Sequence, residues 1–207
     1  MIDLTITIFS LAVLLVSVIV HEIAHGAIAL SLGDQTAKYA GRLTLNPIKH
    51  IDLFGSIVLP LLMLLMTAGQ GPIFGWAKPV PINPYNFKDQ KWGSLKVAIV
   101  GPLSNFAIAL FFGLAIRFLQ LPLELPFTQL LIIIVFSNFF LALFNLIPVP
   151  PLDGHWILFS FLTQSFEQAK VFFSQYGMFL LVFLIFSGGL QWVNMLVIQL
   201  FGLVTGI

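Results

Sequence analysis

The segment His21-Glu22-Ile23-Ala24-His25 has the residue types and the spacing best suited to chemistry in this sequence. Residues four apart share one face of a helix, so His21 and His25 can bind the same metal ion. Glu22 lies beside that face and can reach a metal-bound water as a general base. Three ionisable groups within one apolar helix are costly, and a bound divalent cation would offset that cost. The pattern therefore predicts a metal centre with hydrolytic chemistry.

Two histidines leave such a site one ligand short, because catalytic zinc has three protein ligands and an open water position. Asp153 is the leading candidate for the third ligand. The prolines of residues 148–151 stop the preceding helix, and Gly154 gives the backbone freedom to aim the carboxylate. An ordinary helix-capping role is the alternative for Asp153. His155 is a rival candidate for the third ligand; alternatively, it supports the site or faces water. His50 is interpreted as a histidine at the membrane interface.

The composition indicates where this chemistry takes place. Of 207 residues, 59% are hydrophobic and 8% are charged, against about 25% charged in an ordinary globular domain. A soluble enzyme and a disordered protein are thereby excluded. Nine Lys and Arg against eight Asp and Glu leave no basic excess for phosphates, so we expect no nucleic-acid partner. The chain has no Cys, which excludes disulfides and Cys-ligated metals.

The elements that must position these residues are apolar segments in a lipid bilayer. Six are visible, at residues 4–32, 53–68, 95–119, 128–147, 171–187 and 190–205. Because a spanning helix needs about 20 apolar residues, we predict an all-α, polytopic membrane protein with about five or six membrane segments. Short extended or β segments are expected near the active site, at 42–45 from alternating polarity and around the prolines of 79–84.

The chain is predicted to be a single domain over residues 1–207. Its zinc-site core covers about residues 4–160, and a C-terminal helical hairpin covers about residues 171–205, hinged at Gly188-Gly189. Residues 155–163 are expected to restart a helix after the proline-rich stretch.

The distribution of basic residues predicts the orientation in the membrane. Residues 34–50 hold three Lys or Arg and residues 69–96 hold four, and cytoplasmic loops collect such residues. If both loops are cytoplasmic, the short segment 53–68 around Pro60 is re-entrant rather than spanning, although both alternatives stay open. We expect a multi-pass protein of the cell (plasma or inner) membrane whose active site opens toward the cytoplasm.

Three stretches in this order carry a resemblance to a known family: the H-E-x-x-H at 21–25, Gly101-Pro102-Leu103-Ser104-Asn105, and the stretch from Asn145 to Gly154. They resemble the site-2 protease family of intramembrane zinc metalloproteases, peptidase family M50, over about residues 18–160. The resemblance implies His21, His25 and Asp153 as ligands of one Zn²⁺ per chain, with Glu22 as the catalytic base. It also implies a core of three membrane helices.

The loops at 34–50 and 69–92 are similar to those of a small, mostly prokaryotic subgroup that lacks a PDZ domain. The expected function is that of a zinc-dependent intramembrane endopeptidase, in which Glu22 activates a zinc-bound water to hydrolyse peptide bonds in or near transmembrane segments. Its partner is then a transmembrane protein or peptide. Such a substrate hides its amides in helical hydrogen bonds and must unwind, and residues 41–45 or 76–82 are candidates to receive it by strand addition.

Other residues and functions keep alternatives open. Asn145 is a candidate oxyanion or substrate contact, or else an interhelical hydrogen-bonding residue. The small residues and Asn105 at four-residue spacing between 101 and 113 are interpreted mainly as a close-packing face. A catalytically inactive metal-binding membrane scaffold and a metal transporter are the alternative functions. A transporter would spread ionisable residues through several helices, whereas 97–116 and 172–205 contain no acid and no His. Substrate identity, regulator and oligomeric state stay open.

Overall fold

The computed structural model describes residues 4–66 and 77–207, and within these ranges every regular element is helical. In chain order the elements are α1 (Leu4–Ser31), α2 (Thr36–Tyr39), η1 (Pro47–Lys49), η2 (Leu53–Val58), α3 (Leu59–Met66), η3 (Pro84–Asn86), α4 (Gln90–Phe118), α5 (Pro126–Asn145), α6 (Gly154–Phe161), η4 (Gln164–Phe166), α7 (Glu167–Phe186) and α8 (Leu190–Thr205). The predicted all-α class is confirmed for the described part of the chain.

Four of these helices, α1, α4, α5 and α7, are long and apolar enough to cross a membrane. They coincide with four of the apolar segments found in the sequence. Helix α4 begins five residues earlier than its apolar segment, at Gln90, because the Asp89 side chain accepts a hydrogen bond from the Trp92 amide and caps the helix. The predicted restart of a helix after the prolines is α6.

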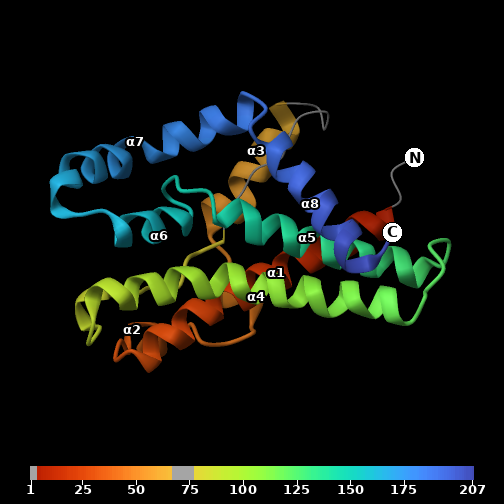
Figure 1. Ribbon diagram of the computed structural model, residues 1–207, viewed down its shortest axis with the longest axis horizontal. Helices are drawn as coiled ribbons and strands as arrows, with labels where there is room; N and C mark the ends of the chain where they lie inside the picture. Colours follow the sequence, from red (N-terminus) through yellow and green to blue (C-terminus); the bar gives the residue numbers. More distant parts are fainter. Residues whose placement is uncertain (1–3, 67–76) are drawn as a thin grey trace.

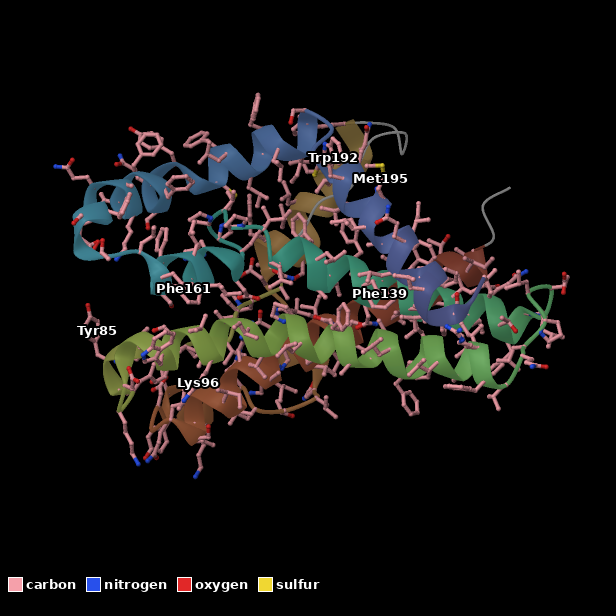
Figure 2. All side chains as sticks on the ribbon, in the orientation of Figure 1. Tyr85, Lys96, Phe139, Phe161, Trp192 and Met195 are labelled. Carbon is pink, nitrogen blue, oxygen red and sulfur yellow. The ribbon has the colours of Figure 1, made fainter. Side chains whose placement is uncertain are left out.

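Helices α1, α4 and α5 lie side by side and α8 packs across α4 and α5 (Figure 1). Helices α4, α5 and α8 share a core that contains Phe139 and Val135 of α5, Ala109 of α4 and Val197 of α8, all at most 1% exposed (Figure 2). Helix α1, which carries His21 and His25, packs against α4 and α5 of this group.

Helices α7 and α8 both form, and the chain turns between them at Gly188, whose φ of +83° favours glycine. The two helices have different neighbours. Helix α8 belongs to the core described above, whereas α7 crosses the proline-rich loop at Gly177, where a Cβ would come within 2.5 Å of Pro150 Cβ. Much of the α7 surface is exposed and apolar, including Phe179 and Phe183.

The predicted strand over residues 42–45 is wrong: the chain bends at residues 43 and 44, and no partner strand lies beside them in the described part of the chain. The reason is the side chain of Arg42. Its guanidinium turns inward and donates to the backbone carbonyls of Lys49, Lys78 and Pro79, which ties the segment into a loop. The polar positions of the alternating pattern are therefore not the solvent-facing positions of a strand, because Arg42 is buried.

Candidate active site

The structure brings His21, His25 and Asp153 together, and one ligand atom from each lies within 4.8 Å of the others. Asp153 Oδ2 lies 3.0 Å from His21 Nε2 and 3.2 Å from His25 Nε2, and the two Nε2 atoms are 3.0 Å apart. Both histidines are 6% exposed. Two imidazole nitrogens and one carboxylate oxygen that converge on one point are the donor set of a catalytic zinc site, so the residues fit this metal.

Asp153 reaches this point because α6 starts immediately after the prolines that end α5. A Cβ on Gly154 would lie 2.2 Å from the Leu146 carbonyl oxygen, so only glycine lets the first turn of α6 pack so tightly on the end of α5. The expected role of Gly154 was backbone freedom, yet its φ is not positive. Its lack of a side chain, rather than its flexibility, aims Asp153.

Each histidine is oriented by a hydrogen bond from its other ring nitrogen. His21 Nδ1 lies 2.6 Å from Asn105 Oδ1, and His25 Nδ1 lies 2.6 Å from the Val97 carbonyl oxygen. Both partners accept, so each Nδ1 carries the proton and each Nε2 presents its lone pair to the metal. Helix α4 approaches closely enough to supply these partners because residue 101 is glycine: a Cβ there would lie 2.3 Å from His25 Nε2.

Asn105 is held by a further amide. Its Nδ2 donates to Asn138 Oδ1 at 2.9 Å and to the Ser17 carbonyl at 3.2 Å, and Asn138 Nδ2 donates to the Ile134 carbonyl. Both asparagines are fully buried. The four-residue spacing predicted Asn105 mainly as part of a packing face and did not reveal its bond to His21. The available signal was a side-chain amide within an otherwise apolar span.

Glu22 points to the same cavity from α1. Its Oε2 accepts a hydrogen bond from the Val80 amide at 2.6 Å. The cavity has a volume of about 350 Å³ and is lined by the metal-ligand candidates, Glu22, Asn145, Trp156 and apolar side chains that include Ile82 and Phe87. A carboxylate, three metal donors and a mostly apolar wall can together bind and hydrolyse a peptide bond.

Asn145 lines this cavity, and its Nδ2 donates to the Leu141 carbonyl of its own helix at 3.0 Å. Neither remaining histidine joins the three-donor group. His155 Nδ1 donates to the Leu152 carbonyl, its ring packs against Trp156, and burial lowers its pKa below the ordinary value. His50 is fully buried within the protein and donates to the Thr44 carbonyl, and its position at the membrane interface stays a prediction.

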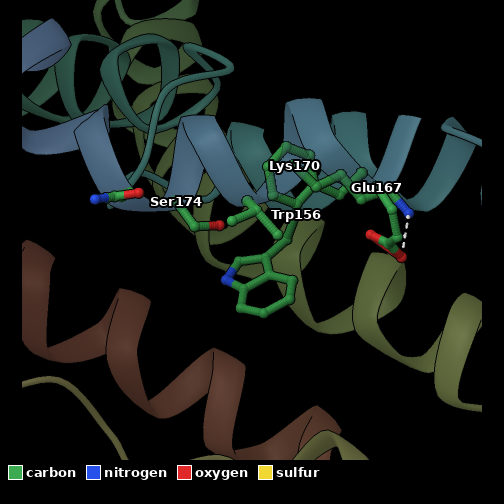
Figure 3. A pocket seen from close by; sticks show the side chains of 7 residues that line it. Trp156, Glu167, Lys170 and Ser174 are labelled. Carbon is green, nitrogen blue, oxygen red and sulfur yellow. Dashed lines mark ion pairs between the residues drawn. The ribbon is translucent and has the colours of Figure 1, made fainter.

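A second groove, of about 560 Å³, lies between α6 and α7 (Figure 3). It contains a Glu167–Lys170 ion pair at 3.5 Å and the hydroxyl of Ser174, but none of the metal-ligand candidates. Trp156 lines both this groove and the metal cavity. The larger groove is therefore a neighbour of the candidate active site and not part of its chemistry.

The comparison with known proteins agrees with this geometry. The model of peptidase family M50 matches residues 122–186, which include Asn145 and Asp153. The chain is 42% identical over 153 residues to the candidate zinc metalloprotease YwhC of Bacillus subtilis (strain 168). The aligned stretch covers 70% of this chain and 65% of YwhC. Residues 122–186 of this chain are thus similar to peptidase family M50.

Two further relatives are less similar to the chain. The chain is 27% identical over 178 residues to the candidate zinc metalloprotease Rip2 of Mycolicibacterium smegmatis, covering 86% of this chain and 66% of Rip2. It is 30% identical over 151 residues to the candidate zinc metalloprotease sll0528 of Synechocystis sp., covering 73% of this chain and 30% of that protein. No solved structure matches the chain.

The chain thus spans just under two thirds of YwhC and of this Rip2. The names of these relatives specify zinc. The donor set of His21, His25 and Asp153 in this chain fits that metal.

Proposed function

We propose that this chain is a zinc-dependent intramembrane endopeptidase of the site-2 protease type, which hydrolyses peptide bonds in or near transmembrane segments of membrane proteins. The observation that carries the proposal is that Asp153 meets His21 and His25 beside Glu22. The two histidines and Glu22 belong to α1, a helix apolar and long enough to cross a membrane. The similarity of residues 122–186 to peptidase family M50 supports it. The inactive scaffold and the metal transporter are disfavoured, because every residue type that hydrolysis needs faces one cavity.

The residues of the chain have distinct tasks in this reaction. Bound zinc supplies a water of lowered pKa and a Lewis acid for the peptide carbonyl. Glu22 accepts the proton of the attacking water and returns it to the leaving amine. One of its carboxylate oxygens is held by the Val80 amide, while the other accepts no hydrogen bond from the described residues. Asn145 donates from the cavity wall to substrate or to the developing oxyanion.

The proposed substrate is a transmembrane helix that unwinds at the site and pairs its backbone with a non-helical segment of the chain. Of the two candidates, residues 41–45 bend at residues 43 and 44 and would have to straighten, whereas residues 77–82 contain no helix, turn or bend; residue 76 lies outside the described residues. The amides of Leu43 and Leu45 donate to no described residue, whereas those of Lys78 and Val80 are already used. Leu43 also contacts the position of Gly26, one residue beyond His25.

We further propose five or six membrane segments, with α8 and residues 53–66 added to the four long helices, and an active site that opens to the cytoplasm of the cell membrane. The hydrogen bond from the Lys78 amide to the His50 carbonyl, at 2.9 Å, supports a re-entrant segment between these two residues. Residues joined in this way lie on the same side of a hydrocarbon core about 30 Å thick.

Metal content and cleavage, measured on the same preparations, test the proposed function. The chain is purified in detergent, its zinc is counted by mass spectrometry, and its cleavage of a synthetic peptide with one membrane-spanning segment is measured in lipid vesicles. We expect about one zinc per chain and cleavage from the wild type. Asp153→Ala should lose both, whereas Glu22→Gln should keep zinc and lose cleavage. Asp89→Ala, a carboxylate that only caps α4, is the matched control.

Different results have different consequences. Zinc retained by Asp153→Ala would move the third ligand to His155 or His50. Normal cleavage by Glu22→Gln would refute the role of Glu22. A wild type that contains no zinc and cleaves nothing would favour the non-catalytic scaffold.

A further inference from the structure

We propose that Arg42 is a positioning residue for the catalytic base, because it holds the backbone of residues 78–80 in the place from which the Val80 amide binds Glu22. This inference rests on the proposed function and adds a residue to it that touches neither metal ligand nor substrate. Arg42 lies in the loop after α2. It does not contact Glu22 itself: it binds the carbonyls of Lys78 and Pro79, and the amide of the next residue, Val80, binds Glu22.

The first observation is the burial of Arg42 without an acidic partner. The residue is 6% exposed, and no ion pair involves it among the described residues. A buried charge is expensive unless its donors are satisfied. Its two terminal nitrogens donate to backbone carbonyls alone, those of Lys49, Lys78 (2.6 Å) and Pro79 (3.1 Å), whereas its Nε has no hydrogen-bond partner among the described residues. The planar fork of arginine suits several fixed acceptors, which the point charge of lysine does not.

The second observation is where these carbonyls lie. Lys78 and Pro79 immediately precede Val80, whose amide donates to Glu22 Oε2 at 2.6 Å. Val80 stands between Pro79 and Pro81, and the rings of both prolines restrict the backbone. A displacement of the two carbonyls therefore moves the Val80 amide with them, rather than being absorbed by local rotation.

The third observation is that the far end of the same segment is fixed as well. Asp34, fully buried, accepts from the Asn83 amide and from Asn86 Nδ2, both at 2.7 Å. Residues 78–83 are thus held by a buried cation at one end and a buried anion at the other. The Val80 amide, between the two anchors, presents a charge-assisted hydrogen bond to Glu22.

The consequence is an oriented base. With Oε2 held, the Glu22 carboxylate cannot rotate freely, and its other oxygen stays directed at the cavity. Misplacement of a reacting group by about 1 Å can cost on the order of 100-fold in rate. Loss of Arg42 should therefore lower kcat while zinc and substrate still bind.

The test uses the full chain, loaded with zinc, in vesicles with the same membrane-spanning peptide. Arg42→Met should lower kcat about 10- to 100-fold, the range for loss of a hydrogen bond to a charged group, with KM changed less than threefold and one zinc still bound. Arg42→Lys should recover part of that loss. Arg117→Met is the matched control, because Arg117 also donates to a backbone carbonyl, that of Leu203, away from the site.

A pair of variants isolates the amide itself. Val80→Ala keeps the N–H and Val80→Pro removes it, so Val80→Pro should have a kcat at least tenfold below that of Val80→Ala. Wild-type kcat in Arg42→Met, or equal values for the two Val80 variants, would overturn the proposal. So would loss of zinc from Arg42→Met in proportion to its activity, because the arginine would then act on the metal site.

A second readout does not depend on cleavage. The chain has no cysteine, so Lys78→Cys, an exposed position, can carry a single spin label. The label should become more mobile when Arg42→Met is added, while a label at the exposed position of Glu124 should not change. If the wild type cleaves nothing, the proposed function has failed and the label alone decides: an immobile label in Arg42→Met overturns the anchoring role, and a mobile one supports it.

Discussion

Asn105 decides which nitrogen of His21 faces the metal. Its carbonyl oxygen accepts from Nδ1, and its amide is in turn oriented by Asn138 and the Ser17 carbonyl, so it cannot easily flip to present a donor. The orientation of the His21 ring therefore depends on two buried side-chain amides, Asn105 of α4 and Asn138 of α5.

Substitution of Asn105 by alanine is therefore expected to weaken zinc binding about 10- to 100-fold, the range found when partners of metal-binding histidines are removed. The measurement is the zinc dissociation constant by competition with a chelator. Asn194→Ala, an exposed asparagine on α8, is the control and should bind zinc like the wild type. Unchanged affinity in Asn105→Ala would show that His21 keeps its orientation without this partner.

At the scale of elements, the turn after α1 is organised by Asp34. Its carboxylate accepts from the Thr36 hydroxyl and amide and from the Asn83 amide and Asn86 side chain. Burial alone would raise the pKa of Asp34, but these hydrogen bonds outweigh it and hold the pKa below its ordinary value of 3.8. The ionised form is thus the one that joins α1 to the loop before α4.

This lowered pKa predicts a pH-dependent contribution to stability. The unfolded chain binds the proton more readily, so the contribution is complete above pH 3.8 and is lost as pH falls through the lower folded pKa. Asp34→Asn should reduce the free energy of unfolding by about 1 to 3 kcal/mol near neutral pH and by progressively less in acid. Thermal unfolding of both proteins in detergent between pH 2 and 7 measures the difference. A gap that stays constant with pH would contradict the prediction.

The elements themselves could be predicted well from sequence, because apolar runs bounded by Gly, Pro and charged residues determine helices locally. The spacing of His21 and His25 and the prolines before Asp153 were likewise sufficient to select the residues that the structure brings together. The strand at 42–45 could not be judged, because a strand depends on a partner that local polarity does not identify. The bonds of Asn105 and Arg42 were missed for the same reason, since their partners lie far along the chain.

At the scale of the whole molecule, the contacts between residues 49–50 and residue 78 relate the fold to the membrane. The Lys78 amide donates to the His50 carbonyl. Arg42 adds bonds to the carbonyls of Lys49 and Lys78. Both basic loops therefore belong to one surface of the molecule, as the positive-inside rule also predicts.

We expect that surface to be cytoplasmic. Single cysteines placed at the exposed positions of Lys49 and Lys88 should both react with a membrane-impermeant maleimide in inside-out vesicles and not in intact spheroplasts. A cysteine at the exposed position of Leu123, between α4 and α5, should show the reverse pattern. The absence of native cysteines makes each signal specific. Labelling of positions 49 and 88 from opposite sides would mean that residues 53–68 span the membrane, which would require the bonds between His50, Arg42 and Lys78 to be broken in the bilayer.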